Sequence, residues 1–163
     1  MADKQSDVPL RLTGRFNHFA STRLGPVTRF YARLHGRLYT RFGGSRFTTL
    51  EGKPVFRLTV PGRKSGAHRP VMLMLIRDGD DLLVCGSNGG NPGEPNWWKN
   101  LMAAGTAQVQ VGPQTWPVAV RLVEDQAEYD RHWRTLVAGY PNFATYQALS
   151  PRRFPIAVLR RTE

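Results

Sequence analysis

The sequence predicts a small, mostly antiparallel split β-barrel with inserted helices. Short apolar runs are separated by glycine- and proline-rich turn signals, which is the pattern of β-hairpins. The strand–helix–strand alternation of a parallel sheet is not visible. The chain has 163 residues, of which 40% are hydrophobic, enough for one core of ordinary domain size. We expect the barrel to occupy residues 47–163, after a basic amphipathic segment at residues 1–46.

The N-terminal segment 1–46 differs in charge from the rest of the chain. It carries nine basic and two acidic residues, whereas the remainder carries fourteen and ten. Residues 26–42 predict a helix, because Pro26 suits its first turn and Gly43-Gly44 suit its end. Arginines recur every four residues beside an apolar stripe. This helix either packs on the barrel with its arginines in water or lies on an anionic membrane surface.

The first barrel strands are expected at 47–50 and 55–60, on either side of a turn at 51–54. A longer strand is expected at 69–76. Asp78-Gly79-Asp80 is a strong hairpin signal, so the next strand, at 82–87, should pair back on it. A glycine-rich loop follows, and then a short helix at 97–104, which Asn96 can cap and Gly105 can end.

The second half of the chain predicts one more hairpin and the closing elements. Strands at 107–111 and 115–122 turn at Gly112-Pro113. Asp125 is suited to cap a helix at 126–138, and a second short helix follows Pro141. Because strand pairing is sequential up to this point, we expect the last strand, at 156–159, to close the barrel.

Composition narrows the class of protein. Cys85 is the only cysteine, so no intrachain disulfide can form, as is usual in a reducing cytosol. The four histidines lack ligand spacing, so no metal site is predicted. The N-terminus lacks the apolar stretch of a signal peptide, and the longest apolar run, 71–76, is too short to span a bilayer. We expect a cytoplasmic protein, peripheral on the inner face of the cell membrane if segment 1–46 docks there.

A basic loop lies between the second and third expected strands, in the sequence PGRKSGAHRP at 61–70. The net charge of +11 favours anionic partners. Gly62 and Gly66 would allow backbone N–H groups to turn inward as an anion nest. Arg63, Lys64 and Ser65 would add donors suited to phosphate. On spacing alone, a solvated turn is the favoured interpretation of this loop.

Three further clusters can carry chemistry. Ser87 and the glycines after it allow a ring to approach the backbone closely. Trp97 and Trp98 point to different faces of one helix, so one belongs to the core and the other can line a pocket. A third cluster shares one helical face, as a core stripe or as a lid over a flat ligand. Its aromatic residues are Tyr140, Phe143 and Tyr146.

In order along the chain, LTVPGRKSG, RDGDDLLVCGSNGG, PNWWKNL and GYPNFATYQ resemble the deazaflavin-dependent nitroreductase family. The resemblance covers about residues 47–160. It implies a split barrel of the flavin-reductase or pyridoxamine-oxidase type that binds coenzyme F420, a long anion with a flavin-like ring. The cofactor contacts that it implies are Arg63, Lys64, Ser65, Arg69, Pro70, Val71, Met72, Leu73, Met74, Cys85, Gly86, Ser87, Asn88, Asn96, Trp97, Trp98, Lys99 and Asn100.

The resemblance also implies the reaction, a hydride transfer from reduced F420 to a quinone, nitroaromatic or enone acceptor. Ser87, Tyr140 and Tyr146 are the expected catalytic residues. Phe143 stands where the family has a tyrosine, so the acceptor pocket of this protein should be more apolar than that of other family members. The alternatives are a flavin mononucleotide (FMN) oxidoreductase on the same barrel and a non-catalytic deazaflavin- or nucleic-acid-binding barrel. No nucleic-acid partner is expected, because the basic residues gather on one helix rather than among stacking aromatics.

Overall fold

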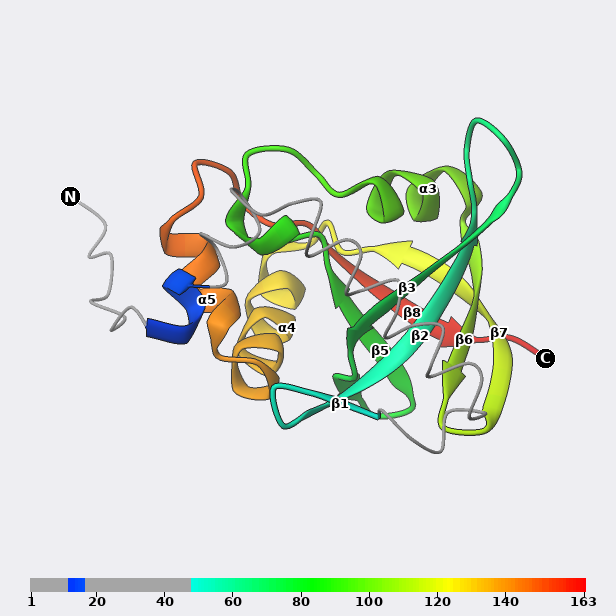
Figure 1. The fold of residues 1–163 in the computed structure, drawn as a ribbon, viewed down its shortest axis with the longest axis horizontal. Helices are drawn as coiled ribbons and strands as arrows, with labels where there is room; N and C mark the ends of the chain where they lie inside the picture. The colour runs from blue at the N-terminus through cyan, green and yellow to red at the C-terminus, as the bar shows by residue number, and fades with distance from the viewer. Residues whose placement is uncertain (1–11, 17–47) are drawn as a thin grey trace.

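The computed structural model describes residues 12–16 and 48–163 (Figure 1). Within these ranges eight strands form one sheet in which every pairing is antiparallel, so the predicted fold class is confirmed. The predicted helix at 26–42 lies outside the described residues, as does most of segment 1–46. Residues 12–16 are helical.

The sheet begins with β1 (Thr49–Leu50), β2 (Lys53–Pro61) and β3 (His68–Met74). Glu51 and Gly52, with φ of 52° and 72°, form a two-residue turn between β1 and β2. Two successive positive φ angles match the twist of a tight hairpin. In β2 buried positions alternate with partly exposed ones, so one face of the strand enters the core.

The predicted strand at 69–76 is wrong at its end, because the chain changes pairing partner there. The N–H of Leu75 still donates to Pro54 O of β2, at 2.8 Å, whereas Ile76 O accepts from Leu83 N of β5, at 2.9 Å. β3 therefore pairs with β2, and the short β4 (Arg77–Asp78) pairs with β5 (Asp81–Cys85). The predicted long hairpin is thus split between two parts of the sheet.

The remaining elements agree closely with prediction. They are α3 (Asn96–Ala104), β6 (Thr106–Val111), β7 (Gln114–Leu122), α4 (Gln126–Gly139), α5 (Asn142–Ala148) and β8 (Ile156–Arg161). Asp125 caps α4 as predicted, because its carboxylate accepts from Glu128 N at 2.8 Å. Helix α3 begins at Asn96, with Pro95 rather than Asn96 at the cap position.

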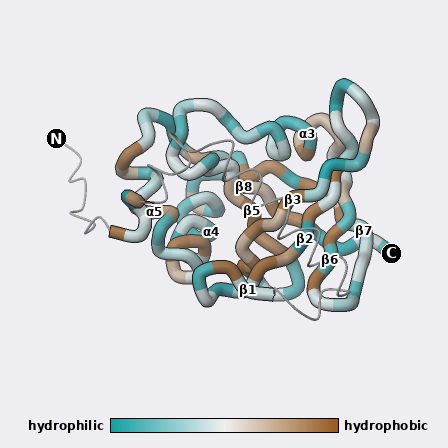
Figure 2. The backbone as a smooth tube through the Cα atoms, viewed as in Figure 1, coloured by the Kyte–Doolittle hydropathy of each residue, from teal (hydrophilic) through white to brown (hydrophobic). Residues whose placement is uncertain are grey.

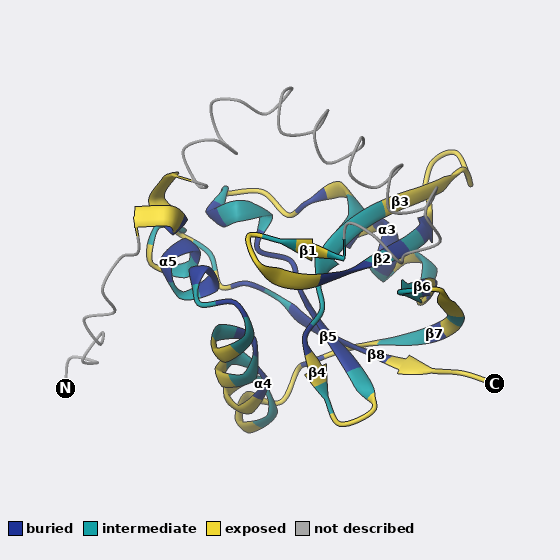
Figure 3. Cartoon of the chain, turned by 60° about the horizontal axis from the view of Figure 1, so that its bottom comes forward, coloured by how far each residue is buried: buried dark blue, intermediate teal, exposed yellow. Residues whose placement is uncertain are grey.

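The closing role of β8 is confirmed. It pairs with β7 on one side and β5 on the other. Its successive residues alternate between two cores: Ala157 and Leu159 belong to the cluster under α3, whereas Ile156 and Val158 belong to the cluster under α4 and α5. Strands β5 and β8 are thus a wall shared by both cores. Figure 2 shows apolar residues concentrated along these strands. Figure 3 shows both strands largely buried, except for the exposed C-terminal end of β8, while the outer side of α4 is exposed.

None of the helices in the described ranges has both the length and the apolar character needed to cross a bilayer.

Candidate active site

A cavity of about 800 Å³, here called the cleft, opens between β3, the end of β5, the start of α3 and the aromatic face of α5. The cleft brings together segments that the sequence separates widely. Its lining includes most of the predicted site residues, namely Pro70, Val71, Met72, Leu73, Met74, Cys85, Ser87, Asn88, Asn96, Trp97, Tyr140 and Tyr146.

One wall of the cleft is β3. Residues 71–74 are apolar and only half-buried, so they present an apolar surface to the cleft. In the described part of the chain, β3 pairs with β2 alone, which makes it an edge strand. An edge strand has backbone N–H and C=O groups that point away from its neighbour. This wall can therefore both stack against a planar ring and hydrogen-bond its polar edge.

The facing wall is the loop that follows β5. Ser87 is 8% exposed and lies at the cleft. Asn88 adopts a left-handed φ of 51°, and its side-chain Nδ2 donates to Gly93 O at 2.8 Å. Trp97 adds an aromatic surface at the start of α3. Asn91, Glu94 and Pro95 also line this side of the cleft but were not predicted from the sequence. The glycines of this loop indicate a flexible turn, not which of its other residues face the cleft.

The aromatic cluster of Tyr140, Phe143 and Tyr146 lines one end of the cleft, at the start of α5. The rings of Tyr140 and Phe143 meet edge to face with centroids 5.2 Å apart. The hydroxyls of Tyr140 and Tyr146 lie 3.1 Å apart, and Asn142 Nδ2 donates to the Tyr140 oxygen at 3.2 Å. All three aromatic residues belong to the core and line the cleft, but Tyr140 is extended and lies between α4 and α5, so the predicted shared helical face is wrong for Tyr140. The role of the cluster as a lid over a ligand stays a prediction.

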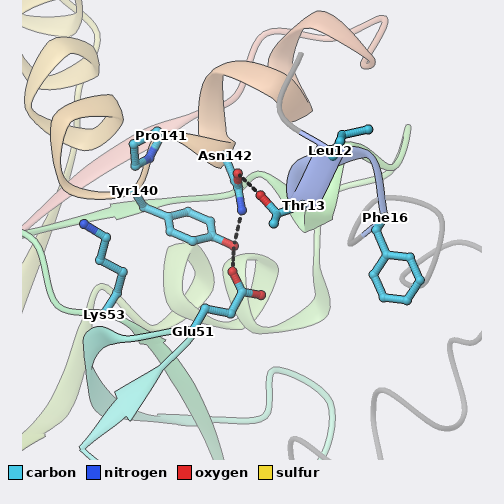
Figure 4. A pocket seen from close by; sticks show the side chains of 8 residues that line it. All are labelled: Leu12, Thr13, Phe16, Glu51, Lys53, Tyr140, Pro141 and Asn142. Carbon is cyan, nitrogen blue, oxygen red and sulfur yellow. Dashed lines mark hydrogen bonds between the residues drawn. The ribbon is translucent and has the colours of Figure 1, made fainter. Parts of the chain in front are cut away.

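Tyr140 also lines a second pocket, of about 560 Å³, between the turn before β2 and residues 12–16 (Figure 4). Its hydroxyl donates to Glu51 Oε2 at 3.1 Å. Burial, the largest cause, raises the pKa of Tyr140, and the hydrogen bonds from Tyr146 and Asn142 oppose that rise. Tyr140 is therefore a neutral phenol over the physiological range. Glu51 was not predicted to be near the site, because nothing local in its turn indicates a contact with α5.

The basic loop adjoins the cleft through its neighbours. Arg63 Nη1 donates to Asn100 Oδ1 at 2.8 Å, and Arg63 Nη2 donates to Asn96 Oδ1 at 3.4 Å. These bonds tie the loop to the start of α3. Lys64, Ser65 and Arg69 are exposed, and Pro70 beside them lines the cleft. A charged ligand tail leaving the cleft here would meet the ammonium and guanidinium groups.

The predicted nest of backbone N–H groups in this loop is wrong. Gly62 N donates to Ala67 O at 2.8 Å, Gly66 N donates to Gly62 O at 2.7 Å, and Ser65 N donates to Gly62 O at 3.1 Å. A tight turn uses these three N–H groups internally, so they are not available to an anion. Gly66 still needs glycine, because its φ is 66°.

Besides Arg63, Lys64, Ser65 and Arg69 of the basic loop, four predicted contacts do not line the cleft. Trp98 is 2% exposed and belongs to the core under α3, so Trp97 is the tryptophan at the cleft. Gly86 packs against the Trp98 ring. Asn100 instead accepts from Arg63, and Lys99 is exposed outside the cleft.

Cys85 lines the cleft through the shared wall of β5, but its thiol is not reactive. The side chain is 7% exposed, and burial raises the pKa of Cys85 well above its usual range. A protonated, buried thiol is a poor nucleophile. Burial therefore argues against Cys85 as a nucleophile.

The antiparallel sheet and its helices place the chain in the class of split-barrel reductases. More specifically, the chain belongs to the F420H(2)-dependent quinone reductase family, whose model matches residues 31–161. It is therefore an oxidoreductase of the F420-dependent quinone reductase type, and F420 rather than FMN is its cofactor.

Individual relatives agree with this assignment. An F420H(2)-dependent quinone reductase of Mycobacterium tuberculosis strain H37Rv is 32% identical over 132 residues, covering 79% of this chain and 89% of the relative. The solved F420-H2-dependent reductase FDR-A is 32% identical, with a TM-score of 0.61 over 66% of this chain and 94% of its own. A structure described as a domain-swapped dimer is 28% identical, with a TM-score of 0.64 over 82% and 98%.

Proposed function

We propose that this protein reduces a quinone in the cleft between β3 and the Ser87 loop, with F420 held along β3. The observation that carries the proposal is the convergence of three features on one cavity: an apolar edge strand, a buried serine and a pair of phenols. A basic loop adjoins the same cavity.

The residues present fit the cofactor. F420 has a flat ring and a long anionic tail, and the cleft offers a flat apolar wall that ends at an exposed cluster of basic side chains. We infer that Lys64, Ser65 and Arg69 bind the phosphate end of F420. Arg63 holds the loop in place through its hydrogen bonds to Asn96 and Asn100. Residues 70–74 line the ring, and Trp97 covers it. When bound in its reduced form, the cofactor supplies a hydride.

The chain itself orients the acceptor and handles charge. Ser87 donates its hydroxyl proton in a hydrogen bond to a quinone oxygen. The Tyr146 hydroxyl, which donates to Tyr140 in the free protein, turns toward the developing oxyanion when a quinone is bound. A neutral phenol that is hydrogen-bonded can stabilise this charge and deliver a proton. The apolar walls exclude water while the two rings are stacked. Phe143, in place of a hydroxyl-bearing residue, favours a quinone over a polar acceptor.

The direct test is the loss of reduced-F420 absorbance with menadione, followed by a nitroimidazole and an enone as comparison acceptors. Ser87→Ala and Tyr146→Phe should each lower kcat about 10- to 100-fold while F420 affinity changes little, because each removes a donor to the charged state. Tyr129→Phe is the matched control, since its hydroxyl donates to Phe154 O at 2.9 Å outside the cleft. Reduced F420 that binds but is oxidised by no acceptor would reject the reductase mechanism.

The phosphate site has its own test. The double variant Lys64→Ala/Arg69→Ala should weaken F420 binding and flatten its salt dependence, because two charge-assisted contacts are lost. Arg134→Ala, an exposed arginine on α4, should leave binding unchanged. Equal affinities for all three proteins would mean that the basic loop is only a solvated turn.

We further propose that residues 47–163 are the cofactor-binding domain and that segment 1–46 brings this domain to an anionic membrane, where lipid-soluble quinones reside. Leu12 and Phe16 support this, since they are 82% and 67% exposed on the described helical turn. Full-length protein should co-sediment with phosphatidylglycerol vesicles at physiological salt, and deletion of 1–46 should abolish this. Failure of the full chain to bind would leave a cytoplasmic enzyme without membrane contact.

A further inference from the structure

Arg152 lies in the loop between α5 and β8 and donates hydrogen bonds to backbone carbonyls of a second loop, residues 86–93, beside the cleft. Its Nη2 donates to Gly86 O at 2.8 Å, to Ser87 O at 3.0 Å and to Gly93 O at 3.3 Å. Its Nε donates to Asn91 O at 3.3 Å. One side chain, distant in sequence, therefore binds four carbonyl groups of residues 86–93.

The charge of Arg152 is not balanced by a described carboxylate. The ion pairs in the described ranges involve other residues, and the nearest ring, that of Phe154, lies 5.0 Å from the guanidinium carbon. Its Nη1 is buried without a hydrogen-bond partner. A half-buried cation that is held by carbonyl dipoles and one aromatic ring, with no carboxylate partner, is a costly way to stabilise a loop. Such a departure from ordinary packing is typical of a functional site.

The geometry of the peptide group links this cation to the cleft. The Ser87 carbonyl points at Arg152, and in a trans peptide the following N–H points the opposite way, so the Asn88 N–H points away from the guanidinium. Asn88 lines the cleft, whereas Arg152 does not. The Asn88 N–H has no partner among the described residues.

The backbone angles favour the same arrangement. Ser87 is right-handed, with φ −68° and ψ −33°, and Asn88 is left-handed, with φ 51°. This alternation turns successive N–H groups toward one side, as in anion-binding concavities. The cation polarises the peptide from its carbonyl end, which makes the N–H at the other end a stronger donor.

We propose that Arg152 is a positioning residue for hydride transfer. It holds the Ser87–Asn88 peptide so that the Asn88 N–H donates, across the cleft, to the quinone oxygen that becomes negative. This inference rests on the proposed function. The quinone gains a hydride from the reduced cofactor and then a proton from Tyr146 or water, so it leaves as a hydroquinone. Between these two events one quinone oxygen carries the charge that the N–H stabilises.

The test compares Arg152→Met, Arg152→Lys and the matched control Arg153→Met. Arg153 is exposed, and its guanidinium lies over the Tyr129 ring, 3.4 Å from the centroid. Four quantities are measured: kcat with menadione, the Kd of F420, the melting temperature, and amide hydrogen exchange of residues 86–93 without cofactor. The exchange measurement is independent of the activity of the loaded enzyme.

We expect Arg152→Met to lower kcat about 10- to 100-fold and change the Kd of F420 less than about threefold, because the donor acts on the transition state. Exchange within residues 86–93 should rise at least about tenfold. Arg152→Lys keeps the charge but fewer bonds, so its kcat should lie between those of the wild type and Arg152→Met. Arg153→Met should resemble the wild type in all four.

Two results would overturn the proposal. One is unchanged kcat or unchanged exchange in Arg152→Met. The other is a parallel fall of kcat, F420 affinity and melting temperature, which would make Arg152 a structural residue only. If the wild type binds reduced F420 but no quinone oxidises it, the proposed function fails instead. The exchange measurement then still decides whether Arg152 holds the loop.

Discussion

Gly86→Ala tests whether the end of β5 is set by packing against α3 or by cofactor contact. A methyl group at this position would lie 2.9 Å from Trp98 Cδ2, 3.2 Å from Trp98 Cε3 and 3.0 Å from Pro155 Cγ. Gly86 is not among the glycines with positive φ, so the backbone itself tolerates alanine. The cost of the substitution is therefore steric.

The size of that cost follows from what the methyl meets. Trp98 is 2% exposed and rigid, so neither its indole nor the Pro155 ring can turn aside. Overpacking of this kind costs about 1–3 kcal/mol. Replacing glycine also removes unfolded-state entropy worth about 0.4–1 kcal/mol in the opposite sense. The net loss should be about 1–2 kcal/mol, which for a chain of this size lowers Tm by about 2–8 °C.

Thermal and urea unfolding measure the change, with Gly93→Ala as the control in the same loop. Nothing lies within 4 Å of a methyl at Gly93, so this variant should be as stable as the wild type or slightly more. F420 affinity of Gly86→Ala, measured below its Tm, should fall far less than that of Lys64→Ala/Arg69→Ala. A Gly86→Ala protein that melts with the wild type would refute the packing argument.

Three shorter predictions follow. Cys85 should resist iodoacetamide in the native protein at pH 8, because burial raises the pKa of its thiol, and Cys85→Ala should keep its activity; rapid native labelling would contradict this. The hydrogen bond from Arg121, aided by His132, lowers the pKa of Glu128 to about 2, so its contribution to stability is full above pH 4.5 and is lost as the pH falls toward 2. Urea unfolding of wild type and Glu128→Gln should therefore differ at pH 6 and converge near pH 2, whereas a constant difference would exclude this linkage. Tyr140→Phe, which loses its contacts with Glu51 and Asn142, should destabilise the protein by about 1–2 kcal/mol in the same assay, and an unchanged midpoint would mean that water replaces them.

Much of the barrel could be predicted because its signals are local. Hairpin turns, the Asp125 cap and the Gly105 end of α3 depend on neighbouring residues, and each appears where expected. The break after Met74 could not be predicted, because Leu75 and Ile76 continue the apolar run without interruption. Their different hydrogen-bond partners, Pro54 and Leu83, are set by the path of the whole sheet.

The candidate site was likewise predictable where its signals are local in sequence and not where they depend on the folded chain. Motifs contiguous in sequence predicted Ser87, Trp97 and Tyr146 at one cleft, and all three line it. The periodicity of α3 placed the two tryptophans on different faces but could not say which face is inside. Arg152 was not predicted to be near the site, because its partners are backbone carbonyls. Every residue has a carbonyl group, so the sequence does not indicate which ones Arg152 binds.

The position of β8 has a consequence for how the protein is made. Leu82 in β5 pairs with Leu159 in β8, and Val120 in β7 pairs with the same Leu159. Until this strand leaves the ribosome, β5 and β7 both present open edges, which are templates for pairing with other chains. The nascent barrel is therefore prone to aggregation until β8 has emerged and paired with both strands. A chain stopped at residue 155 should collect in inclusion bodies or be degraded, even though it contains every residue of the cleft.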